Sequence, residues 1–223
     1  YIRKIGGISE IFPFDLTDLS GIPTLVENVN RYFGDSVSVL VNSAGIAVLG
    51  FVEDVPVEAY LHNLQINFFA ALALIKAVVP EMKKKRSGQI INISSGVGRR
   101  GLPGVSSYCV SKFALNALTE SIRVELASYG ITVMLFSPGL VATGFSNRIK
   151  IYGNLKEKFI NGNMSSPEEI AEKIVRASEN AKREVTLSLR TKISYHLNYW
   201  APRLFDYILK RRLLISGQIQ DGK

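Results

Sequence analysis

Residues 89–112 of this chain read QIINISSGVGRRGLPGVSSYCVSK, and this stretch decides the fold. Its first part, Gln89–Ile93, is a short and almost uninterrupted apolar run, which is typical of a strand covered on both faces in a parallel sheet. A glycine-rich loop follows, and apolar residues then recur at helical spacing from Ser106 to Tyr129, where Gly130 supplies a C-terminal stop. The stretch therefore predicts one strand–loop–helix unit of an α/β domain.

The same alternation of patterns continues along the chain. β-branched apolar runs predict further strands at Ile8–Phe14, Val37–Val41, Ile131–Phe136 and Glu184–Leu189. The sequence Ser166-Pro167-Glu168-Glu169 has the cap, the early proline and the early acids of a helix start. This order predicts an α/β domain with a Rossmann-like, doubly wound parallel sheet. Residues 140–165 predict a long loop, either a lid over a site or a surface excursion.

The composition limits the kinds of partner and compartment. The chain has 223 residues, of which 47% are hydrophobic and 21% charged, an ordinary balance for one globular domain. Cys109 is the only cysteine, so no disulfide can form within the chain, and a reducing, cytoplasmic location is the default. The net charge of +8 suits an anionic partner such as a dinucleotide phosphate, an acyl carrier or a membrane surface. Nucleic acid is disfavoured because the basic residues form no stripe with interleaved aromatics, and no apolar run reaches the ~20 residues that span a bilayer.

Tyr108 and Lys112 form the first candidate for chemistry. Four residues apart on the predicted helix, their side chains share a face and can act on one bound molecule. A phenol with its ordinary pKa of about 10 exchanges protons poorly at neutral pH, and a nearby ammonium is expected to lower that pKa. The Tyr-x-x-x-Lys pattern is not specific by itself, because Tyr152 and Lys156 repeat it. We interpret the second copy as coincidence, since no strand precedes it.

A serine at the end of the preceding strand selects the first copy. Ser95 lies 13 residues before Tyr108, at the carboxyl edge of the predicted sheet, where open α/β sheets build their sites. The glycines and the proline between them form a loop that can fold the serine back beside the tyrosine. Alone, Ser95 would more simply be a strand-end serine that satisfies loop backbone groups. Together with Tyr108 and Lys112, it predicts an acid–base site.

The residues around this site resemble a known family. Between Val39 and Thr143 the chain is similar to the short-chain dehydrogenases/reductases of the classical type. Residues 42–45, Asn-Ser-Ala-Gly, resemble the family's Asn-Asn-Ala-Gly element after its fourth strand, with Ser43 in place of the second asparagine. Asn67 matches a helix asparagine that holds a proton-relay water in the family. A helix-kink or capping role is its alternative, and in either case a buried amide needs a partner.

Two further segments extend the resemblance to roughly residues 8–190. Ser137-Pro138-Gly139-Leu140-Val141-Ala142-Thr143 resembles the segment that passes the nicotinamide end of the cofactor. Asp15 matches the acid after the family's third strand that contacts the adenine, although a simple turn acid at a strand end explains it as well.

The resemblance implies reversible hydride transfer between a nicotinamide cofactor and a carbonyl or secondary alcohol. It assigns the catalytic roles to Asn67, Ser95, Tyr108 and Lys112. Tyr108 would give a proton to the developing alkoxide, and Ser95 would hydrogen-bond the same oxygen. Lys112 would hold the nicotinamide ribose, and Asn67 would hold the water chain that returns the proton.

The same resemblance implies a cofactor and a substrate class. The implied cofactor-binding residues are Asp15, Leu16, Asn42, Ala44, Gly45, Tyr108, Lys112, Pro138, Gly139, Val141 and Thr143. The cofactor is NAD or NADP, with NADP slightly favoured, and the substrate is expected to be lipophilic, such as a 3-oxoacyl thioester, a steroid or a related ketone. A homo-oligomer is expected. His62 and His196 are isolated in the sequence, so we assign no metal site.

The resemblance stops short of the family's beginning. The family opens with a strand, a glycine-rich turn and a helix whose amide groups receive the pyrophosphate, and no such element precedes Ile8. Gly6-Gly7 instead resembles the end of a helix from Tyr1 to Ile5. We therefore expect a fragment that lacks the first two strands, with Ile8–Phe14 unpaired and one edge of Val37–Val41 exposed. The alternative to an active oxidoreductase is a catalytically incompetent remnant that acts through interactions.

The end of the chain, residues 191–223, is predicted to be a basic helical tail outside the main domain of residues 1–190. Its apolar side chains at helical spacing are Ile193, Leu197, Trp200, Leu204 and Ile208, and its last basic residues are Lys210, Arg211 and Arg212. One interpretation is an amphipathic helix at a membrane surface or a substrate entrance. The other, which we favour, is a terminal helix packed on the domain or on a second subunit. Pro202 predicts a break within the tail.

Overall fold

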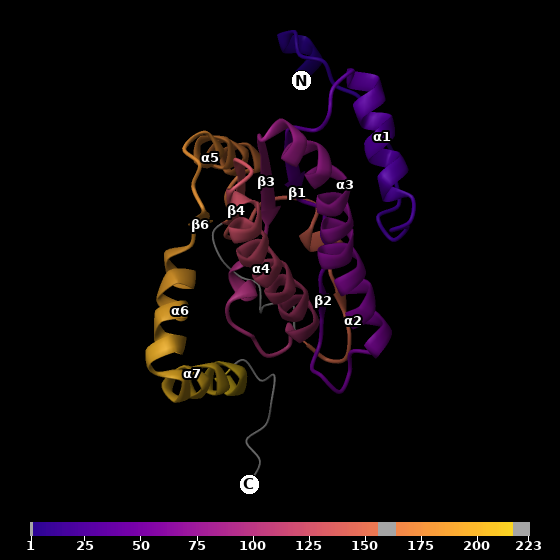
Figure 1. Ribbon diagram of the computed structural model, residues 1–223. Helices are drawn as coiled ribbons and strands as arrows, with labels where there is room; N and C mark the ends of the chain where they lie inside the picture. Colours follow the sequence, from indigo (N-terminus) through magenta and orange to yellow (C-terminus); the bar gives the residue numbers. More distant parts are fainter. Residues whose placement is uncertain (1, 156–163, 216–223) are drawn as a thin grey trace.

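The computed structural model describes residues 2–155 and 164–215, and a parallel sheet lies at its centre (Figure 1). The four strands of this sheet follow the order β1-β3-β4-β6. Their bounds are Val39–Asn42 (β1), Gly88–Ile93 (β3), Ile131–Ser137 (β4) and Glu184–Thr186 (β6). Every neighbouring pair is parallel, so the carboxyl ends of the strands meet at one edge. A separate parallel pair consists of β2 (Val48–Leu49) and β5 (Lys150–Ile151).

Helices cover both faces of the main sheet. The α-helices are α1 (Ile22–Phe33), α2 (Val57–Leu64), α3 (Ala70–Lys85), α4 (Ser106–Ala127), α5 (Pro167–Glu179), α6 (Leu189–Trp200) and α7 (Pro202–Ile215). The shorter helical segments are η1 (Ile2–Ile5), the π-helical turn η2 (Gln65–Phe69), η3 (Gly96–Gly98) and η4 (Ser146–Arg148). Side chains of α1, α3 and α4 form one buried cluster with the sheet, and α5 forms another on the opposite face.

The strands explain why the apolar runs in the sequence are nearly continuous. Successive side chains of a strand point to opposite faces. In β3, Ile90 packs into the cluster under α3 and α4, whereas Ile91 packs into the cluster under α5. Val133 and Met134 of β4 divide between the two clusters in the same way. Both faces are covered, so both sets of residues must be apolar, which confirms the predicted doubly wound fold class.

The predicted strand at Ile8–Phe14 does not form. The segment has no strand assignment, and Ile8 and Ile11 are 78% and 82% exposed. An extended segment becomes a strand only where a neighbour satisfies its backbone groups. Among residues 2–155 and 164–215, no strand pairs with this one. An unpaired segment was expected here, but its assignment as a strand was wrong.

At the carboxyl end, one predicted boundary shifts and one predicted break is confirmed. The strand predicted over Glu184–Leu189 stops at Thr186, because Ser188 already caps α6 by accepting a hydrogen bond from the Thr191 amide at 3.3 Å. The predicted break in the tail is present, with α6 ending before Ala201 and α7 beginning at Pro202.

The two tail helices contact the rest of the protein. Phe205 and Leu213 of α7 are buried, and Asp206 forms an ion pair with Arg100. The tail helices α6 and α7 are therefore packed on the domain. The predicted boundary at residue 190 stays a prediction.

One helical segment is longer and more apolar than the sequence analysis expected. α2, η2 and α3 join into a continuous helix, Val57–Lys85, whose length and composition would suffice to cross a membrane. The sequence contains no uninterrupted apolar run of that length because Asn63, Asn67 and Lys76 divide it. Ile75, Val78 and other apolar residues of this helix lie in the core of the domain, and core helices commonly meet the same criterion.

The end of α4 gives a stability prediction with a matched control. Gly34 and Gly130 both have φ +70°, but a Cβ at Gly130 would lie 2.5 Å from the carbonyl oxygen of Arg86, whereas a Cβ at Gly34 meets nothing within 4 Å. Gly34→Ala should cost about 1 kcal/mol for the left-handed backbone alone. Gly130→Ala should cost at least about 1 kcal/mol more, because the Arg86 backbone must move. Equal losses in the free energy of unfolding, measured by chemical denaturation, would contradict this packing.

Candidate active site

Ser95, Tyr108 and Lys112 converge at the carboxyl end of β3. Ser95 follows the strand directly and precedes η3, while the other two lie in the first two turns of α4. Ser95 lies near enough to the Tyr108 hydroxyl to lower its pKa. The Lys112 ammonium lies 5.7 Å from the centroid of the Tyr108 ring and donates a 3.0 Å hydrogen bond to the Ile93 carbonyl. A phenol, a hydroxyl and a cation therefore meet at one point.

Burial shifts the pKa of both titratable groups. Lys112 is only 4% exposed, and desolvation lowers its pKa to about 8. Desolvation raises the pKa of Tyr108 to about 12, while the neighbouring Ser95 side chain acts in the opposite direction. The expectation that Lys112 would depress the Tyr108 pKa was wrong for this structure, because the ammonium lies over the ring and burial dominates. Tyr108 is therefore a protonated donor at neutral pH.

Asn67 joins three parts of the site through its side-chain amide. Its Oδ1 accepts a 2.8 Å hydrogen bond from the amide of Ile46, and its Nδ2 donates to the Ile46 carbonyl at 2.9 Å. Nδ2 also donates to Ser111 Oγ of α4 at 2.9 Å. Asn67 lies in the π-helical turn η2, so the structure shows a role in helix geometry and in fixing the loop after β1. The buried amide of Asn67 therefore has the hydrogen-bond partners that it needs, from backbone groups and a hydroxyl.

Gly45 lets this loop approach the cation closely. A Cβ at Gly45 would lie 3.3 Å from Asn67 Oδ1 and 3.7 Å from Lys112 Nζ. The space beside the ammonium is thus bordered by backbone rather than by a side chain. Ala44, the preceding residue, is exposed.

Asn42 is directed into the sheet. Its Nδ2 donates to Asn92 Oδ1 at 2.8 Å, and Asn92 Nδ2 donates to Thr119 Oγ1 of α4 at 2.9 Å. This chain of hydrogen bonds ties β1 to β3 and to α4 where the strands approach the site. The structure thus shows that Asn42 holds the ends of these strands together.

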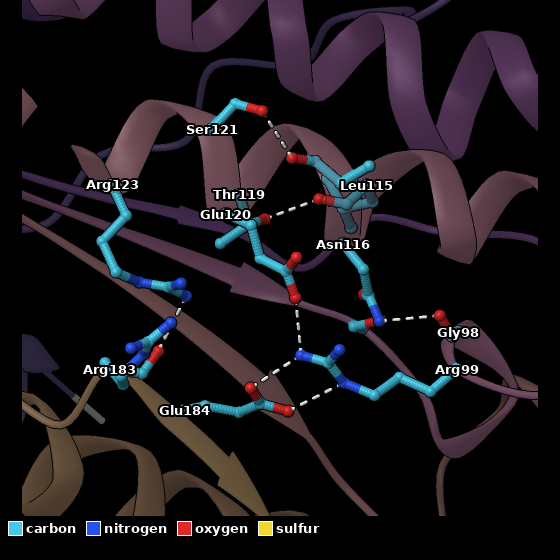
Figure 2. A network of polar contacts seen from close by, with 12 residues as sticks. Gly98, Arg99, Leu115, Asn116, Thr119, Glu120, Ser121, Arg123, Arg183 and Glu184 are labelled. Atoms are coloured by element: carbon cyan, nitrogen blue, oxygen red, sulfur yellow. Dashed lines mark hydrogen bonds and ion pairs between the residues drawn. The ribbon is translucent and has the colours of Figure 1, made fainter. Parts of the chain in front are cut away.

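Sequence reasoning missed a stripe of buried polar residues on α4. These residues are Ser107, Ser111, Asn116 and Thr119, and each is at most 4% exposed. Asn116 accepts a hydrogen bond from Ser94 at 2.5 Å and donates to the Gly98 carbonyl at 2.9 Å (Figure 2). Ser107 accepts from Asn63 of α2 at 2.8 Å. Their spacing near multiples of four residues is the signal that could have identified them.

The remaining residues expected at the cofactor lie farther along the same edge. Asp15 is exposed and accepts hydrogen bonds from the amide and hydroxyl of Thr17, which hold its pKa below the usual value. This is the local turn considered as the alternative for Asp15. Leu16 beside it is partly buried. Gln65 of η2 donates to the Thr17 carbonyl at 3.0 Å, which ties the turn to the helix that carries Asn67.

The segment after β4 is only partly fixed by hydrogen bonds. Val141 pairs with Ser165, and the Ala142 amide donates to the Ser165 carbonyl at 2.9 Å. Pro138 is partly buried, whereas Gly139 and Thr143 are exposed. Phe145 reaches the site, with its ring centroid 6.1 Å from that of Tyr108. In the second Tyr-x-x-x-Lys copy, the expectation that no strand precedes Tyr152 was wrong, because β5 ends directly before it. Lys156 lies outside the described residues.

The residues present fit the ribose and nicotinamide end of a dinucleotide. Lys112 Nζ forms no salt bridge with any carboxylate in the described part of the chain, and Ile93 takes one of its three donor positions. Ribose hydroxyls are suitable acceptors for a buried cation with donors to spare. The backbone at Gly45 leaves room on that side. No strand–glycine turn–helix element for a pyrophosphate occurs within residues 2–155 and 164–215.

Comparison with known proteins defines the class. The family model described as short chain dehydrogenase matches residues 2–151, so this chain belongs to the short chain dehydrogenases. It is 33% identical over 208 residues to the dehydrogenase/reductase SDR family protein 7-like of Drosophila melanogaster, covering 91% of this chain and 63% of that protein. It is 31% identical to the dehydrogenase/reductase SDR family member 7B of Xenopus laevis, over 89% of this chain and 62% of that protein. The chain thus spans less than two thirds of these relatives.

A solved structure supports the fold independently. A short-chain dehydrogenase from Streptomyces avermitilis superposes with a TM-score of 0.80, covering 95% of this chain and 82% of that one at 24% identity. The resemblance inferred from residues 42–45, 67, 95, 108 and 112 is therefore confirmed at the level of family and fold.

The buried ammonium predicts a specific pH dependence of stability. Between pH 8 and 10.5, Lys112 binds more protons in the unfolded chain than in the folded chain. The free energy of unfolding therefore rises with pH across this range. Relative to Lys112→Met, the unsubstituted protein should gain about 2–3 kcal/mol of unfolding free energy from pH 7 to pH 10. The same substitution at exposed Lys76 provides the baseline. If the difference in unfolding free energy between the wild type and Lys112→Met did not change with pH across this range, the enclosed position of the cation would be contradicted.

Proposed function

We propose that this protein is an NAD(P)-dependent oxidoreductase that interconverts a carbonyl group and a secondary alcohol. The observation that carries the proposal is the convergence of Tyr108 and Ser95 beside the enclosed ammonium of Lys112, whose Nζ lies 5.7 Å from the centroid of the Tyr108 ring. Family membership supports the same reaction class. When bound, the nicotinamide cofactor supplies or accepts the hydride.

The two hydroxyl groups act on the reacting oxygen. In the reducing direction Tyr108 donates its Oη proton to the developing alkoxide, and its raised pKa keeps that proton in place at neutral pH. Ser95 Oγ donates a hydrogen bond to the same oxygen and orients it toward the phenol. In the oxidising direction Tyr108 takes the proton back from the alcohol.

Lys112 and Asn67 support the proton transfer. The N–H groups of Lys112 that the Ile93 carbonyl does not occupy are available to the nicotinamide ribose. We assign to Asn67 the water through which the proton returns. Asn67 contacts Ser111, and the Ser111 hydroxyl donates a hydrogen bond to the Tyr108 carbonyl at 2.9 Å. A single residue thus links Asn67 to the backbone of Tyr108.

The proposed cofactor contacts follow the same edge. Asn42, Ala44 and Gly45 would line the cofactor after β1, and Pro138, Gly139, Val141 and Thr143 would pass its nicotinamide end. Asp15 and Leu16 would meet the adenine. The net charge of +8 suits the phosphates of the dinucleotide and favours NADP over NAD.

A lipophilic carbonyl compound is the proposed substrate. The surroundings of Tyr108 are apolar: it packs with a cluster around buried Leu49, Val105 and Leu155. The Phe145 ring adds an aromatic wall on the side of the loop after β4. Such a wall favours a 3-oxoacyl, steroid-like or related ketone over a small polar one.

Replacement of the phenol tests the assignment. Tyr108→Phe in the full-length protein should lower carbonyl reduction at least about a hundredfold, because the proton donor is lost, while cofactor affinity changes less than about twofold. The measurement is NAD(P)H oxidation with a panel of lipophilic ketones, together with a cofactor binding isotherm. Tyr152→Phe, the same change in the second Tyr-x-x-x-Lys copy, should leave turnover nearly intact. Undiminished reduction by Tyr108→Phe would refute the assignment.

We further propose that the outer faces of α6 and α7 contact an anionic membrane surface. Apolar and aromatic side chains are exposed on both helices, and they are Leu189, Ile193, Tyr199, Trp200, Leu204, Tyr207, Ile208 and Ile215. The two helices carry six lysine or arginine residues and one acid, Asp206. A second copy of this face would meet it with like charge, whereas anionic lipid complements it.

A vesicle assay tests this contact. The protein should sediment with phosphatidylserine-containing vesicles but not with phosphatidylcholine vesicles, and added salt should weaken the binding. Trp200→Ser should reduce the bound fraction, because an interfacial anchor is lost. Val124→Ser on α4 is the matched control, since Val124 and Trp200 are both 79% exposed. Equal binding by both variants, or binding that ignores lipid charge, would contradict the proposed surface.

A further inference from the structure

The loop between Ser95 and α4 is held from outside by the C-terminal helices. Tyr195 of α6 donates a 3.0 Å hydrogen bond from its hydroxyl to the carbonyl of Gly96, the residue directly after Ser95. The two residues are 99 positions apart in the sequence. Tyr195 is half-buried, and desolvation raises its pKa to about 12, so its hydroxyl stays a donor over the whole neutral range.

Close packing of α6 on this loop reinforces the hydrogen bond. A Cβ at Gly96 would lie 2.8 Å from Thr191 Oγ1 and 2.9 Å from Thr191 Cγ2. Glycine is therefore required for the backbone after Ser95 to pass this close to α6. Ser188, the capping residue of α6, in turn holds Thr191 by accepting a hydrogen bond from the Thr191 amide.

The middle of the loop is also anchored. Arg100 donates to Asn198 Oδ1 of α6 at 2.5 Å and forms an ion pair with Asp206 of α7. Arg99 lies between Glu184 of β6 and Glu120 of α4, with both contacts at 2.7 Å (Figure 2). The first half of the loop is thus fixed at Gly96, Arg99 and Arg100 to parts of the chain that follow β4.

The hydroxyl of Ser95 has few restraints of its own. Oγ accepts a long, 3.5 Å hydrogen bond from the Val97 amide and lies near the Tyr108 hydroxyl. The Ser95 carbonyl accepts from the Gly98 amide at 3.0 Å. Where Ser95 Oγ points therefore depends on the path of the backbone through Gly96.

We propose that Tyr195 is a positioning residue, which holds the Gly96 carbonyl so that Ser95 Oγ stays directed at the reacting oxygen. This inference rests on the proposed function. It makes α6 part of the support of the site, although none of its side chains is assigned a catalytic role. Removal of the Tyr195 hydroxyl frees the Gly96 carbonyl, and Ser95 then samples orientations that do not stabilise the reacting oxygen.

A double-mutant cycle in the full-length protein tests the proposal. Tyr195→Phe should lower kcat for carbonyl reduction about tenfold with the KM of the cofactor unchanged, because an oxyanion partner is misplaced while the cofactor contacts remain. In a Ser95→Ala background the same change should lower kcat less than about twofold, since no hydroxyl is left to position. Ser194→Ala is the matched control, because its hydroxyl donates within α6 to the Thr191 carbonyl. An unchanged kcat for Tyr195→Phe, or an equal loss in both backgrounds, would overturn the proposal.

Amide hydrogen exchange gives a reading that does not depend on turnover. Exchange of the Val97 and Gly98 amides should be faster in Tyr195→Phe than in the wild type, because the loop is released, and Ser194→Ala should leave it unchanged. Unaltered protection would overturn the inference whatever the kinetics. If the wild type reduces no carbonyl compound at all, the proposed function fails instead, and the exchange data still show whether Tyr195 holds the loop.

Discussion

The carboxyl end of β3 carries an enclosed positive charge on which the geometry of the site depends. Lys112 is almost fully buried, and its ammonium donates to the Ile93 carbonyl. Removing a charge from water is costly, so the groups around it must be close and fixed to compensate. The Ile93 carbonyl, which accepts a hydrogen bond from the ammonium at 3.0 Å, is such a group. Because α4 is a regular helix, the same restraint fixes Tyr108, four residues earlier, beside Ser95.

Directional contacts of α4 set its register against the sheet. Apolar contacts alone would allow the helix to slide or turn with little loss, whereas hydrogen bonds in a dry interior are specific in direction. Ser111 bonds to Asn67, Asn116 to Ser94, and Thr119 to Asn92. These contacts lie at successive levels along α4. Together they connect α4 to η2 and to both ends of the segment from Asn92 to Ser94, and so hold the phenol and the cation at the sheet edge.

Local sequence patterns predicted the elements and the central three residues. Continuous apolar runs located β3 and β4, and the spacing of Tyr108 and Lys112 with a strand-end Ser95 located the candidate site. The strand at Ile8–Phe14 was predicted wrongly, because strand formation depends on a neighbour that local pattern cannot report. The direction of the Tyr108 pKa shift was missed for a similar reason, since burial is a property of the folded site. The contact between Tyr195 and Gly96 joins residues 99 positions apart and leaves no local signal.

Deuterium tracing tests the central claim most directly. The full-length protein is incubated with NADH or NADPH carrying deuterium at C4 of the nicotinamide, together with lipophilic ketones, and the products are examined by mass spectrometry. The expected product is an alcohol with one deuterium on its carbinol carbon and an ordinary, exchangeable hydrogen on its oxygen, delivered from Tyr108. Recovery of unreduced ketone with both cofactors across the panel would contradict the proposed hydride transfer.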